Sequence, residues 1–412
     1  MINSILFFVF VLSFYGVLEY YGWQAVKTIT SPKHLKLAAW IYWGVAISVF
    51  ALFVLNRPFL HKYMNREMSS YFGVLFMILL LSKFIVLLFL LPGDVWGGLK
   101  SIVAKFSPPT YPSAEGAIPR SEFLSRIALL TAAVPAGTLV YGVIANAYNY
   151  QFHRTTIKFP NLPKAFDGFK IIQLSDIHAG SFTRTEPVEK VVAQINALNP
   201  DLILFTGDLV NNVATEMDPY IDIFGQLKAK HGVFSITGNH DYGDYVQWDT
   251  PEEKAANFEA FKAVHQKMGW NLLLNENRTI EQGGETITLL GIENWGGGRF
   301  AKYGKFEQAV KGTENAPFKI MMSHDPSSWD MRIRTEFPDI DLTLSGHTHG
   351  AQFGIENKWL KWSPSQYIYK QWAGLYNEGK QFLYVNRGFG FLGYPGRVGI
   401  LPEVAEITLK RA

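Results

Sequence analysis

Polar residues of metal-binding types follow five separate apolar runs in the carboxyl-terminal part of the chain. They are Asp176 and His178 after Lys170–Ser175, Asp208 after Leu202–Thr206, Asn239, His240 and Asp241 after Val233–Thr237, His324 after Lys319–Ser323, and His347 and His349 after Leu342–Ser345. Imidazole and carboxylate groups are ligands that suit Mn, Fe and Zn. The chain contains no cysteine, so thiolate metal sites, disulfides and a cysteine nucleophile are excluded. These residues therefore predict a metal site built from oxygen and nitrogen donors.

The spacing of these residues indicates that they converge on one site. In Asp176–His178 and in His347–His349 the outer residues are two positions apart, and in an extended chain such residues point to the same side. A glycine precedes Asp208, Asn239 and His347, and glycine allows a sharp turn or a close approach of the backbone to an ion. In open α/β sheets, ligands bind at the carboxyl ends of the strands. We therefore expect the five strand ends to surround one crevice.

Two metal ions held by such ligands are suited to hydrolysis of phosphate esters. Two cations about 3.5–4 Å apart lower the pKa of a shared water, so that hydroxide is available near neutral pH. The same charges stabilise phosphate oxygens in the transition state. A neighbouring histidine can protonate the leaving oxygen, which typically contributes about 10²–10⁴-fold to the rate. This chemistry requires no covalent enzyme intermediate.

The ordered motifs Asp-x-His, Gly-Asp, Gly-Asn-His-Asp, a histidine after an apolar strand, and Gly-His-x-His resemble those of the calcineurin-like metallophosphoesterase family. The tail from Asn386 to Val404 resembles the membrane-associated bacterial branch of that family. The resemblance covers about residues 165–410. It implies an α/β fold with four layers, in which two mixed sheets lie between outer helices. It also implies a metal-dependent phosphoesterase.

The resemblance further implies a role for each residue. One metal would be held by Asp176, His178, Asp208 and His349, and the other by Asp208, Asn239, His324 and His347. The cofactors would be two divalent ions, Mn, Fe or Zn. His240 would act as the acid or transition-state donor, with Asp241 orienting it. In one departure from the family, Asn211 stands where the pattern Gly-Asp-x-x-Asp has its second aspartate, which puts metal preference and rate in question rather than the ligand set.

The amino-terminal part has the composition of a membrane domain. Charged residues make up 18% of the chain, where roughly 25% is usual for soluble domains. Four apolar runs, at about 2–22, 37–55, 71–91 and 127–145, have the length of about 17–25 residues that a helix needs to cross a bilayer. We therefore predict a domain of four transmembrane helices over residues 1–150 and a phosphoesterase domain over residues 151–412. Lys83 lies within the third run, and we expect it to pair with Glu19 or another polar group.

Beyond residue 150, apolar runs alternate with helical patterns, as in an α/β domain. The spacing predicts helices over Pro187–Leu198, Tyr220–Lys230 and Glu252–Met268. The net charge is only +3, from 38 basic and 35 acidic residues, so nucleic acid is not an expected partner. The expected partners are a phosphate-ester substrate and the lipid bilayer, and the oligomeric state is left open.

The distribution of basic residues predicts the orientation in the membrane. The links after the first and third runs carry seven lysines and arginines, and the link after the second run carries three. Cytoplasmic links are the richer ones in lysine and arginine. We therefore expect a multi-pass protein of the cell membrane whose catalytic domain is extracytoplasmic. The segment Arg120–Leu124 resembles a twin-arginine export signal, with Ser121 in place of the second arginine.

Three other functions are less well supported. The segment Gly298–Phe306 fails as a phosphate-binding loop, because Gly304 is one residue too far from Gly298 and Phe306 replaces the required Ser or Thr. No His-Glu-x-x-His zinc peptidase motif is present. A membrane sensor or scaffold that uses a non-catalytic phosphoesterase domain for binding is the main alternative, but such domains usually lack ligands, and here all are present. The sequence does not decide whether the enzyme cleaves monoesters, diesters or pyrophosphates, or whether the substrate is lipid-linked.

Overall fold

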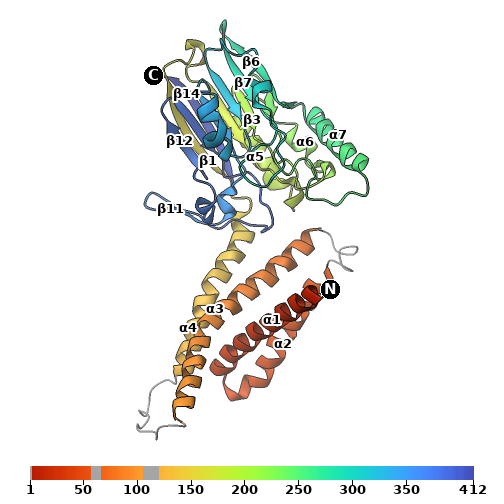
Figure 1. The fold of residues 1–412 in the computed structure, drawn as a ribbon, viewed down its shortest axis with the longest axis vertical. Helices are drawn as coiled ribbons and strands as arrows, with labels where there is room; N and C mark the ends of the chain where they lie inside the picture. Colours follow the sequence, from red (N-terminus) through yellow and green to blue (C-terminus); the bar gives the residue numbers. More distant parts are fainter. Residues whose placement is uncertain (1, 57–65, 105–119) are drawn as a thin grey trace. The chain divides into compact units, whose positions relative to one another are not determined.

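The computed structural model describes residues 2–56, 66–104 and 120–412 of the chain. The chain divides into two compact units, Met1–Tyr141 and Gly142–Ala412. The first unit is helical, and the second combines sheets and helices (Figure 1).

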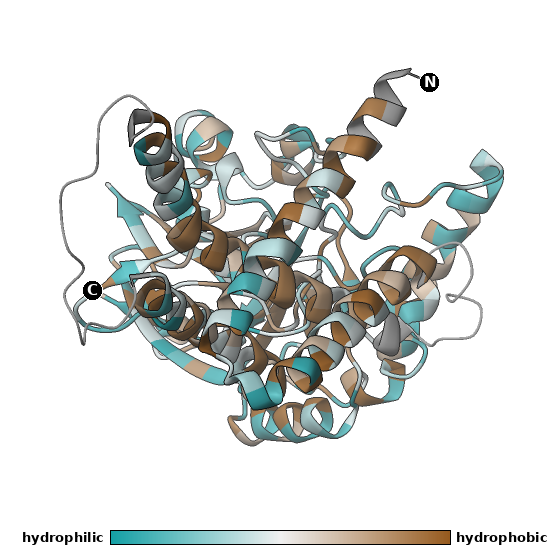
Figure 2. Ribbon diagram, turned by 90° about the horizontal axis from the view of Figure 1, so that it is seen from below, coloured by the Kyte–Doolittle hydropathy of each residue, from teal (hydrophilic) through white to brown (hydrophobic). Residues whose placement is uncertain are grey.

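The first unit consists of long apolar helices. They are α1 (Ile2–Ile29), α2 (Leu35–Asn56), α3 (Arg66–Ala104) and α4 (Arg120–Tyr141), with the short helix η1 (Pro32–His34) before α2. Among the described residues, three helical segments are long and apolar enough to cross a membrane: Pro32–Leu55, Tyr71–Ile102 and Ser121–Asn146. Hydrophobic residues, brown in Figure 2, recur along the helix that starts at the amino terminus. These helices identify a membrane protein.

Two parts of the membrane prediction stay predictions. The expected span at about 2–22 falls on α1, where several of the first side chains lie outside the described residues. Arg57, Lys62 and Lys105, which entered the count of basic residues, also lie outside them. The number of spans and the side of the membrane on which residues 151–412 lie are therefore argued below as proposals.

Lys83 of α3 pairs with Glu19 of α1, as the sequence led us to expect. Both side chains are buried, and the Tyr42 hydroxyl donates to Glu19 Oε2 at 3.0 Å. The ammonium of Lys83 also lies 5.6 Å from the centre of the Tyr42 ring. A charge in an apolar helix bundle is costly unless it is paired, so this cluster ties α1, α2 and α3 together.

The second unit contains two six-stranded sheets and a two-stranded hairpin. The first sheet has the order β1 (Gln151–Phe159), β14 (Glu403–Arg411), β2 (Lys170–Leu174), β3 (Leu202–Phe205), β4 (Val233–Ser235), β5 (Asn271–Leu272). The second has the order β12 (Gly374–Glu378), β13 (Gln381–Val385), β9 (Leu342–Ser345), β8 (Lys319–Met322), β7 (Glu285–Gly291), β6 (Glu276–Gln282). The hairpin is β10 (Ile355–Glu356) with β11 (Lys361–Trp362). Both sheets are mixed, because β2–β5 and β7–β9 are parallel while β14 and β6 run antiparallel to their neighbours β2 and β7.

Successive side chains along a strand point to opposite faces of its sheet, so each sheet has one core on either face. In β3, Leu204 faces a core shared by the two sheets, and Phe205 faces a second core beneath α5 and α7. In β8, Ile320 belongs to the shared core and Met321 to a third core beneath α8. Strands buried on both faces have nearly continuous apolar sequences, as these do. The predicted fold of two mixed sheets flanked by helices is confirmed.

The helices of the second unit cover the outer faces of the sheets (Figure 1). They are α5 (Glu186–Ala197), α6 (Ile221–Phe224), α7 (Pro251–Met268), α8 (Phe306–Val310) and α9 (Arg334–Glu336). Single helical turns are η3 (Gly142–Asn146), η4 (Lys164–Phe166), η5 (Ala179–Ser181), η6 (Ala214–Met217), η7 (Trp329–Ile333), η8 (His349–Gln352) and η9 (Pro364–Tyr367). Helix α7 begins where predicted, because Thr250 Oγ1 accepts the Glu253 N–H at 3.2 Å and Pro251 fills the first position.

The predicted helix over Tyr220–Lys230 is shorter than expected. Only Ile221–Phe224 forms α6, and the chain turns after Gly225. The side chain of Asn196, on α5, donates to the Gln226 carbonyl at 2.7 Å and accepts the Lys228 N–H at 2.9 Å. Because the Asn196 side chain bonds this carbonyl and this N–H, they are not used for the hydrogen bonds of a further helical turn.

Candidate active site

The carboxyl ends of five strands from both sheets bring the predicted site residues together. Strands β2, β3 and β4 are parallel neighbours in the first sheet, and β8 and β9 are parallel neighbours in the second. Parallel strands present their carboxyl ends at one edge. The side chain of Asp208, after β3, reaches that of His324, after β8, so the two edges meet at one site.

The backbone at these strand ends adopts conformations that are uncommon outside glycine. Five residues have positive φ: Asp176 (53°), His178 (48°), Asp208 (59°), His347 (71°) and His349 (50°). Such conformations cost on the order of 1–3 kcal/mol each and persist where surrounding structure fixes them, typically at functional sites. These strained backbone conformations direct the five polar side chains toward the two clusters described next.

Two glycines permit the strand ends to approach closely. A Cβ on Gly238 would lie 2.2 Å from Asp208 Oδ1, and a Cβ on Gly346 would lie 1.9 Å from Ser175 Oγ. Neither position can hold a larger residue without movement of the neighbouring strand end. These are two of the three glycines that the sequence places before candidate ligands.

Asp176, His178 and His349 form a first cluster of buried ligand atoms. His178 Nε2 lies 3.1 Å from His349 Nε2, which lies 3.2 Å from Asp176 Oδ1. The Oδ2 atom of Asp208 lies 3.6 Å from His178 Nε2. Four potential ligands therefore face a common point.

Asp208, His324 and His347 form a second cluster. His324 Nε2 lies 3.1 Å from the same Oδ2 of Asp208 and 3.2 Å from His347 Nδ1. Asn239 is buried nearby, where its Nδ2 donates to Tyr245 while its Oδ1 has no hydrogen-bond partner among the described residues. The carboxylate of Asp208 thus faces both clusters.

The donor set fits divalent metal ions. Ligands about 2.0–2.2 Å from an ion and at right angles to one another lie about 3 Å apart, close to the separations within each cluster. The imidazole of His324 has its Nδ1 2.7 Å from the Thr206 carbonyl, which accepts that N–H and leaves Nε2 free to bind a metal. The unpartnered Oδ1 of Asn239 is a further oxygen donor. Nitrogen and oxygen donors of this kind suit Mn, Fe and Zn.

The electrostatics keep the central carboxylate ionised. Burial acts to raise the pKa of Asp208, but the nearby histidines, His324 first, hold it well below its usual range. Burial acts to lower the pKa of His324, and the charge of Asp208 outweighs it and raises the value to about 10. Burial lowers the pKa of His178 to about 3, so its imidazole is neutral. Metals bind deprotonated carboxylates and neutral imidazoles, so Asp208 and His178 are already in the binding form, whereas a metal ion at His324 would displace its proton.

His240 and Asp241 lie beside the clusters but make different kinds of contact. The ring of His240 packs edge-on against that of His178, with centres 4.9 Å apart, and its Nδ1 lies 2.8 Å from the Asn211 carbonyl. Asp241 accepts N–H groups from four residues: Asp208 (2.9 Å), Leu209 (2.8 Å), Val210 (3.3 Å) and Gly238 (2.7 Å). The hydrogen bond of the His240 ring is thus with Asn211, and an orienting role of Asp241 stays a prediction. Asp241 fixes the loops after β3 and β4.

Burial, reinforced by the charge of Asp208, raises the pKa of Asp241 to about 8, against the four N–H donors. Through the four hydrogen bonds, the two oxygens of Asp241 hold the loop that carries Asp208 in place.

The clusters border a pocket of about 310 Å³ whose lining is partly polar and partly apolar. Five of the seven metal-ligand candidates line it with His240, and the large apolar lining residues, which we call the apolar rim, are Phe300, Ile368, Tyr369 and Leu392. The Tyr369 hydroxyl lies 2.7 Å from His347 Nε2. Phe300 belongs to the glycine-rich segment that failed as a phosphate-binding loop, so this segment borders the site.

Sequence reasoning missed several supporting residues. Arg397, which is fully buried, has Nη2 3.2 Å from His349 Nδ1. Tyr245 holds Asn239, and Thr206 holds His324 through its carbonyl. Two of these supports carried a signal, since Tyr369 belongs to the aromatic-rich stretch after His349 and Arg397 to the tail from Asn386 to Val404.

Both parts of the chain match known families. Residues 3–147 match the family described as probable calcineurin-like phosphoesterase, transmembrane domain, and residues 169–351 match the family described as calcineurin-like phosphoesterase. The chain is 27% identical, over 98% of its length and 89% of the relative, to "transmembrane protein with metallophosphoesterase domain" of Danio rerio.

Two bacterial proteins are similar over the second unit. One is the Bacillus subtilis metallophosphoesterase YkuE, 31% identical over 62% of this chain and 84% of that protein. The other is UDP-2,3-diacylglucosamine pyrophosphatase LpxG of Chlamydia trachomatis, 29% identical over 64% of this chain and 91% of that protein. These matches confirm the resemblance inferred from the motifs.

Proposed function

Because the chain belongs to the calcineurin-like phosphoesterase family, we propose that it is a membrane-anchored enzyme that hydrolyses phosphate esters or pyrophosphates with two divalent metal ions. The observation that carries this proposal is the position of Asp208 Oδ2, 3.1 Å from His324 Nε2 and 3.6 Å from His178 Nε2. A single carboxylate oxygen facing both clusters is the arrangement that a bridged pair of ions requires.

The proposed ligands follow the two clusters. Asp176, His178, Asp208 and His349 hold one ion, and Asp208, Asn239, His324 and His347 hold the other. When bound, Mn, Fe or Zn ions polarise phosphate oxygens and lower the pKa of a bound water. The protein supplies the fixed ligand positions and the pocket beside them.

His240 is the proposed proton donor. Its Nδ1 is tied to the Asn211 carbonyl, which leaves Nε2 as the atom that can donate to a substrate oxygen. It lines the pocket beside His178 and Asn239. During hydrolysis water loses one proton to solvent and forms the new P–O bond, while the P–O bond to the leaving group breaks. The leaving oxygen takes up one proton from Nε2 of His240, which regains it from solvent. Asp241 supports this step indirectly by fixing the loop that carries Asp208.

The substrate class is proposed from the pocket and the relatives. The apolar rim favours a substrate with an apolar portion beside its phosphate. The name of the Chlamydia relative describes a pyrophosphatase acting on a diacylated sugar nucleotide. We therefore favour a lipid-linked phosphate or pyrophosphate over a small soluble ester. A non-catalytic sensor is disfavoured because every proposed ligand residue is present and six of the seven form the two clusters that meet at Asp208.

The proposed location is the cell membrane, with several spans and the catalytic unit outside the cytoplasm. The support is the excess of lysine and arginine in the first and third links.

The test is hydrolysis of bis-p-nitrophenyl phosphate by the full-length protein in detergent, with Mn²⁺ and after chelation. Asp208→Asn is the test variant, and Asp249→Asn, at an exposed site, is its control. We expect metal-dependent turnover in the wild type and control, and its loss together with bound metal in Asp208→Asn. Wild-type turnover that survives chelation, or full turnover in Asp208→Asn, would contradict the two-metal proposal.

A further inference from the structure

Exposed apolar side chains gather on one short segment of the second unit. Ten large hydrophobic residues are exposed between residues 142 and 412, and six of them fall between Phe353 and Ile368. These six, which we call the hairpin patch, are Phe353, Ile355, Trp359, Leu360, Tyr367 and Ile368. Trp359 is 84% exposed and Ile368 79%. Clustered exposure of this kind marks an interaction surface.

The hairpin patch is built on a rigid turn. Strands β10 and β11 pair through Ile355 with Trp362 and Glu356 with Lys361. Asn357 closes the turn, because its Oδ1 accepts the N–H groups of Trp359 and Leu360 at 2.8 and 3.0 Å. The turn is therefore held by backbone groups and Asn357, and the side chains of Trp359 and Leu360 stay exposed.

Backbone hydrogen bonds tie the patch to the end of a membrane-spanning segment. The segment Ser121–Asn146 is long and apolar enough to cross a membrane, and its last turn, η3, lies in the second unit. The Arg397 N–H donates to the Gly142 carbonyl at 3.1 Å. The next residue, Val398, pairs with Phe353, and its carbonyl accepts the Gly354 N–H at 2.9 Å. Two short steps through the backbone thus connect the end of the span to the start of the hairpin.

The charges around the patch fit a membrane surface. Lys358 lies at the tip, with its ammonium 4.7 Å from the centre of the Trp359 ring. The exposed Lys370, two residues after Ile368, lies 3.6 Å from Asp330 Oδ2. The acidic residue of the hairpin, Glu356, pairs with Arg387, which also pairs with Glu403. Tryptophan and lysine side by side suit the boundary between lipid headgroups and acyl chains, where anionic headgroups attract basic side chains.

The patch is continuous with the proposed active site. Ile368 belongs both to the patch and to the rim of the metal pocket. With Tyr369 it also lines a neighbouring pocket of about 360 Å³ that includes Gly297, Ser327 and Met331. A molecule lying along the patch would therefore lie beside the metal pocket.

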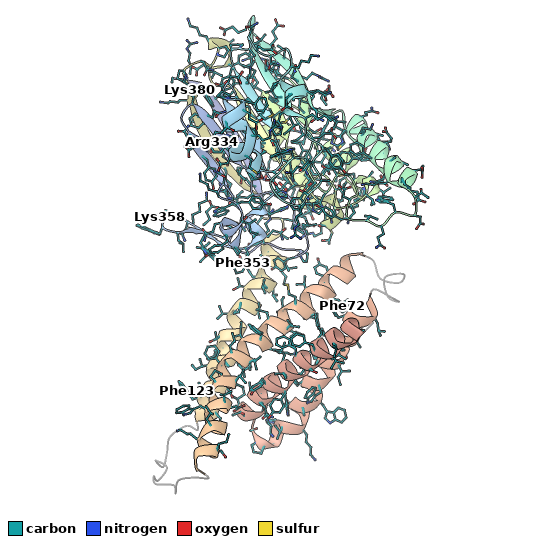
Figure 3. All side chains as sticks on the ribbon, viewed as in Figure 1. Phe72, Phe123, Arg334, Phe353, Lys358 and Lys380 are labelled. Atoms are coloured by element: carbon teal, nitrogen blue, oxygen red, sulfur yellow. The ribbon has the colours of Figure 1, made fainter. Side chains whose placement is uncertain are left out.

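We propose that the hairpin patch docks on the surface of the lipid bilayer, so that the metal pocket receives a phosphate or pyrophosphate carried by a lipid. The docking stands on the exposed patch and its link to the membrane span. The substrate class rests in addition on the proposed phosphoesterase function. Figure 3 labels Phe353 and Lys358 toward one end of this unit and Lys380 toward the other, which provides a control position.

The docking is tested by single-cysteine labelling, which the chain allows because it has no cysteine of its own. Full-length Trp359→Cys and Lys380→Cys carry an environment-sensitive fluorophore in nanodiscs of phosphatidylcholine and phosphatidylglycerol. We expect blue-shifted emission and quenching by brominated acyl chains at position 359 and neither at position 380. Emission at position 359 as water-like as at 380 overturns the proposal. Shielding without quenching by brominated lipid also overturns it, because a protein partner would then cover the patch.

The substrate class is tested with the double variant Trp359→Ser/Leu360→Ser, whose residues do not line the pocket. Phosphatidic acid and CDP-diacylglycerol in the nanodiscs serve as lipid probes, and bis-p-nitrophenyl phosphate serves as the soluble one. We expect the variant to lose at least about tenfold in lipid turnover, from lost burial of two apolar side chains, and to keep soluble turnover. Wild-type turnover of the soluble probe without either lipid would overturn the lipid substrate class. No turnover of any probe would overturn the phosphoesterase function, and the fluorophore measurement would still decide the docking.

Discussion

The Oδ2 atom of Asp208 lies 3.1 Å from Nε2 of His324, which joins a carboxylate at the end of β3 in one sheet to an imidazole at the end of β8 in the other. The relative position of the two sheets therefore sets the geometry of the site. The core between the sheets, which includes Leu204 and Ile320, fixes that position. Packing between the sheets and the proposed chemistry are thus linked through one pair of residues.

Replacing His240 by glutamine is expected to slow turnover without removing metal. His240 belongs to neither of the two metal-ligand clusters, and its proposed role is to protonate the leaving oxygen. Loss of such a donor typically costs about 10²–10⁴-fold. The loss should be smaller for p-nitrophenolate, which leaves readily without a proton, than for an alkoxide. The measurement compares kcat for aryl and alkyl phosphates alongside metal content, and an equal loss for both leaving groups would argue against proton donation.

Replacing Arg397 by methionine is expected to lower thermal stability and weaken metal binding. The guanidinium is buried and donates to the carbonyls of Arg387, Gly388 and Gly390, and it touches His349 Nδ1. Leaving buried carbonyls without donors costs about 1–3 kcal/mol for each group. Arg397→Lys should not restore stability, because an ammonium cannot span the same acceptors.

The control for Arg397 is Arg154→Met, which removes an exposed guanidinium paired with Glu406. Exposed pairs contribute about 0–1 kcal/mol, so this variant should melt within a few degrees of the wild type. Equal melting temperatures for Arg397→Met and Arg154→Met would show that the buried guanidinium has no special role.

The sequence was sufficient to predict the residues that gather in the two clusters but not the groups that hold those residues in place. Ligand candidates follow strands directly, so their convergence depends only on parallel strand order, as with Asp208 after β3 and His324 after β8. The Asn211 carbonyl that holds His240 was hidden because any residue type supplies a carbonyl. The partner of His349, Arg397, comes from a distant loop whose path depends on tertiary packing.

Some helix ends and strand pairings likewise could not be predicted from local sequence patterns. The helix predicted at Tyr220–Lys230 stops early because Asn196, from another helix, takes its backbone groups. The pairing of β1 with β14 joins opposite ends of the second unit, and no periodicity in either strand specifies that partner.

A reporter fused after Ala412 is expected to behave as extracytoplasmic. The first and third links carry more lysine and arginine than the second, and cytoplasmic links carry the excess. Paired fusions to alkaline phosphatase, active outside the cytoplasm, and to green fluorescent protein, fluorescent inside, measure the orientation. Fluorescence without phosphatase activity would reverse the proposed orientation.

His265 is expected to make the second unit lose stability in mild acid. Burial against Phe261 and Trp270 lowers the pKa of His265 to about 4, from about 6.5 in the unfolded chain. Between these values the unfolded state binds the proton and the folded state does not, so the free energy of unfolding falls as pH falls from 6.5 toward 4. The full difference corresponds to about 3 kcal/mol.

The variant His265→Phe isolates this contribution, because the other histidines titrate equally in both proteins. Its melting temperature should fall less than that of the wild type over the same pH interval. Parallel melting profiles for the two proteins would show that His265 is protonated in the folded state.

The buried pair of Glu19 and Lys83 is expected to behave as a unit. Removing one partner leaves a charge in an apolar bundle, which costs about 3–5 kcal/mol for a buried pair. Lys83→Met and Glu19→Gln should therefore each lower the melting temperature of the full-length protein in detergent. The double variant should recover much of the loss, because no unpaired charge remains. If the double variant instead loses the sum of the two single effects, Glu19 and Lys83 contribute through separate contacts, and the pair does not hold α1 to α3.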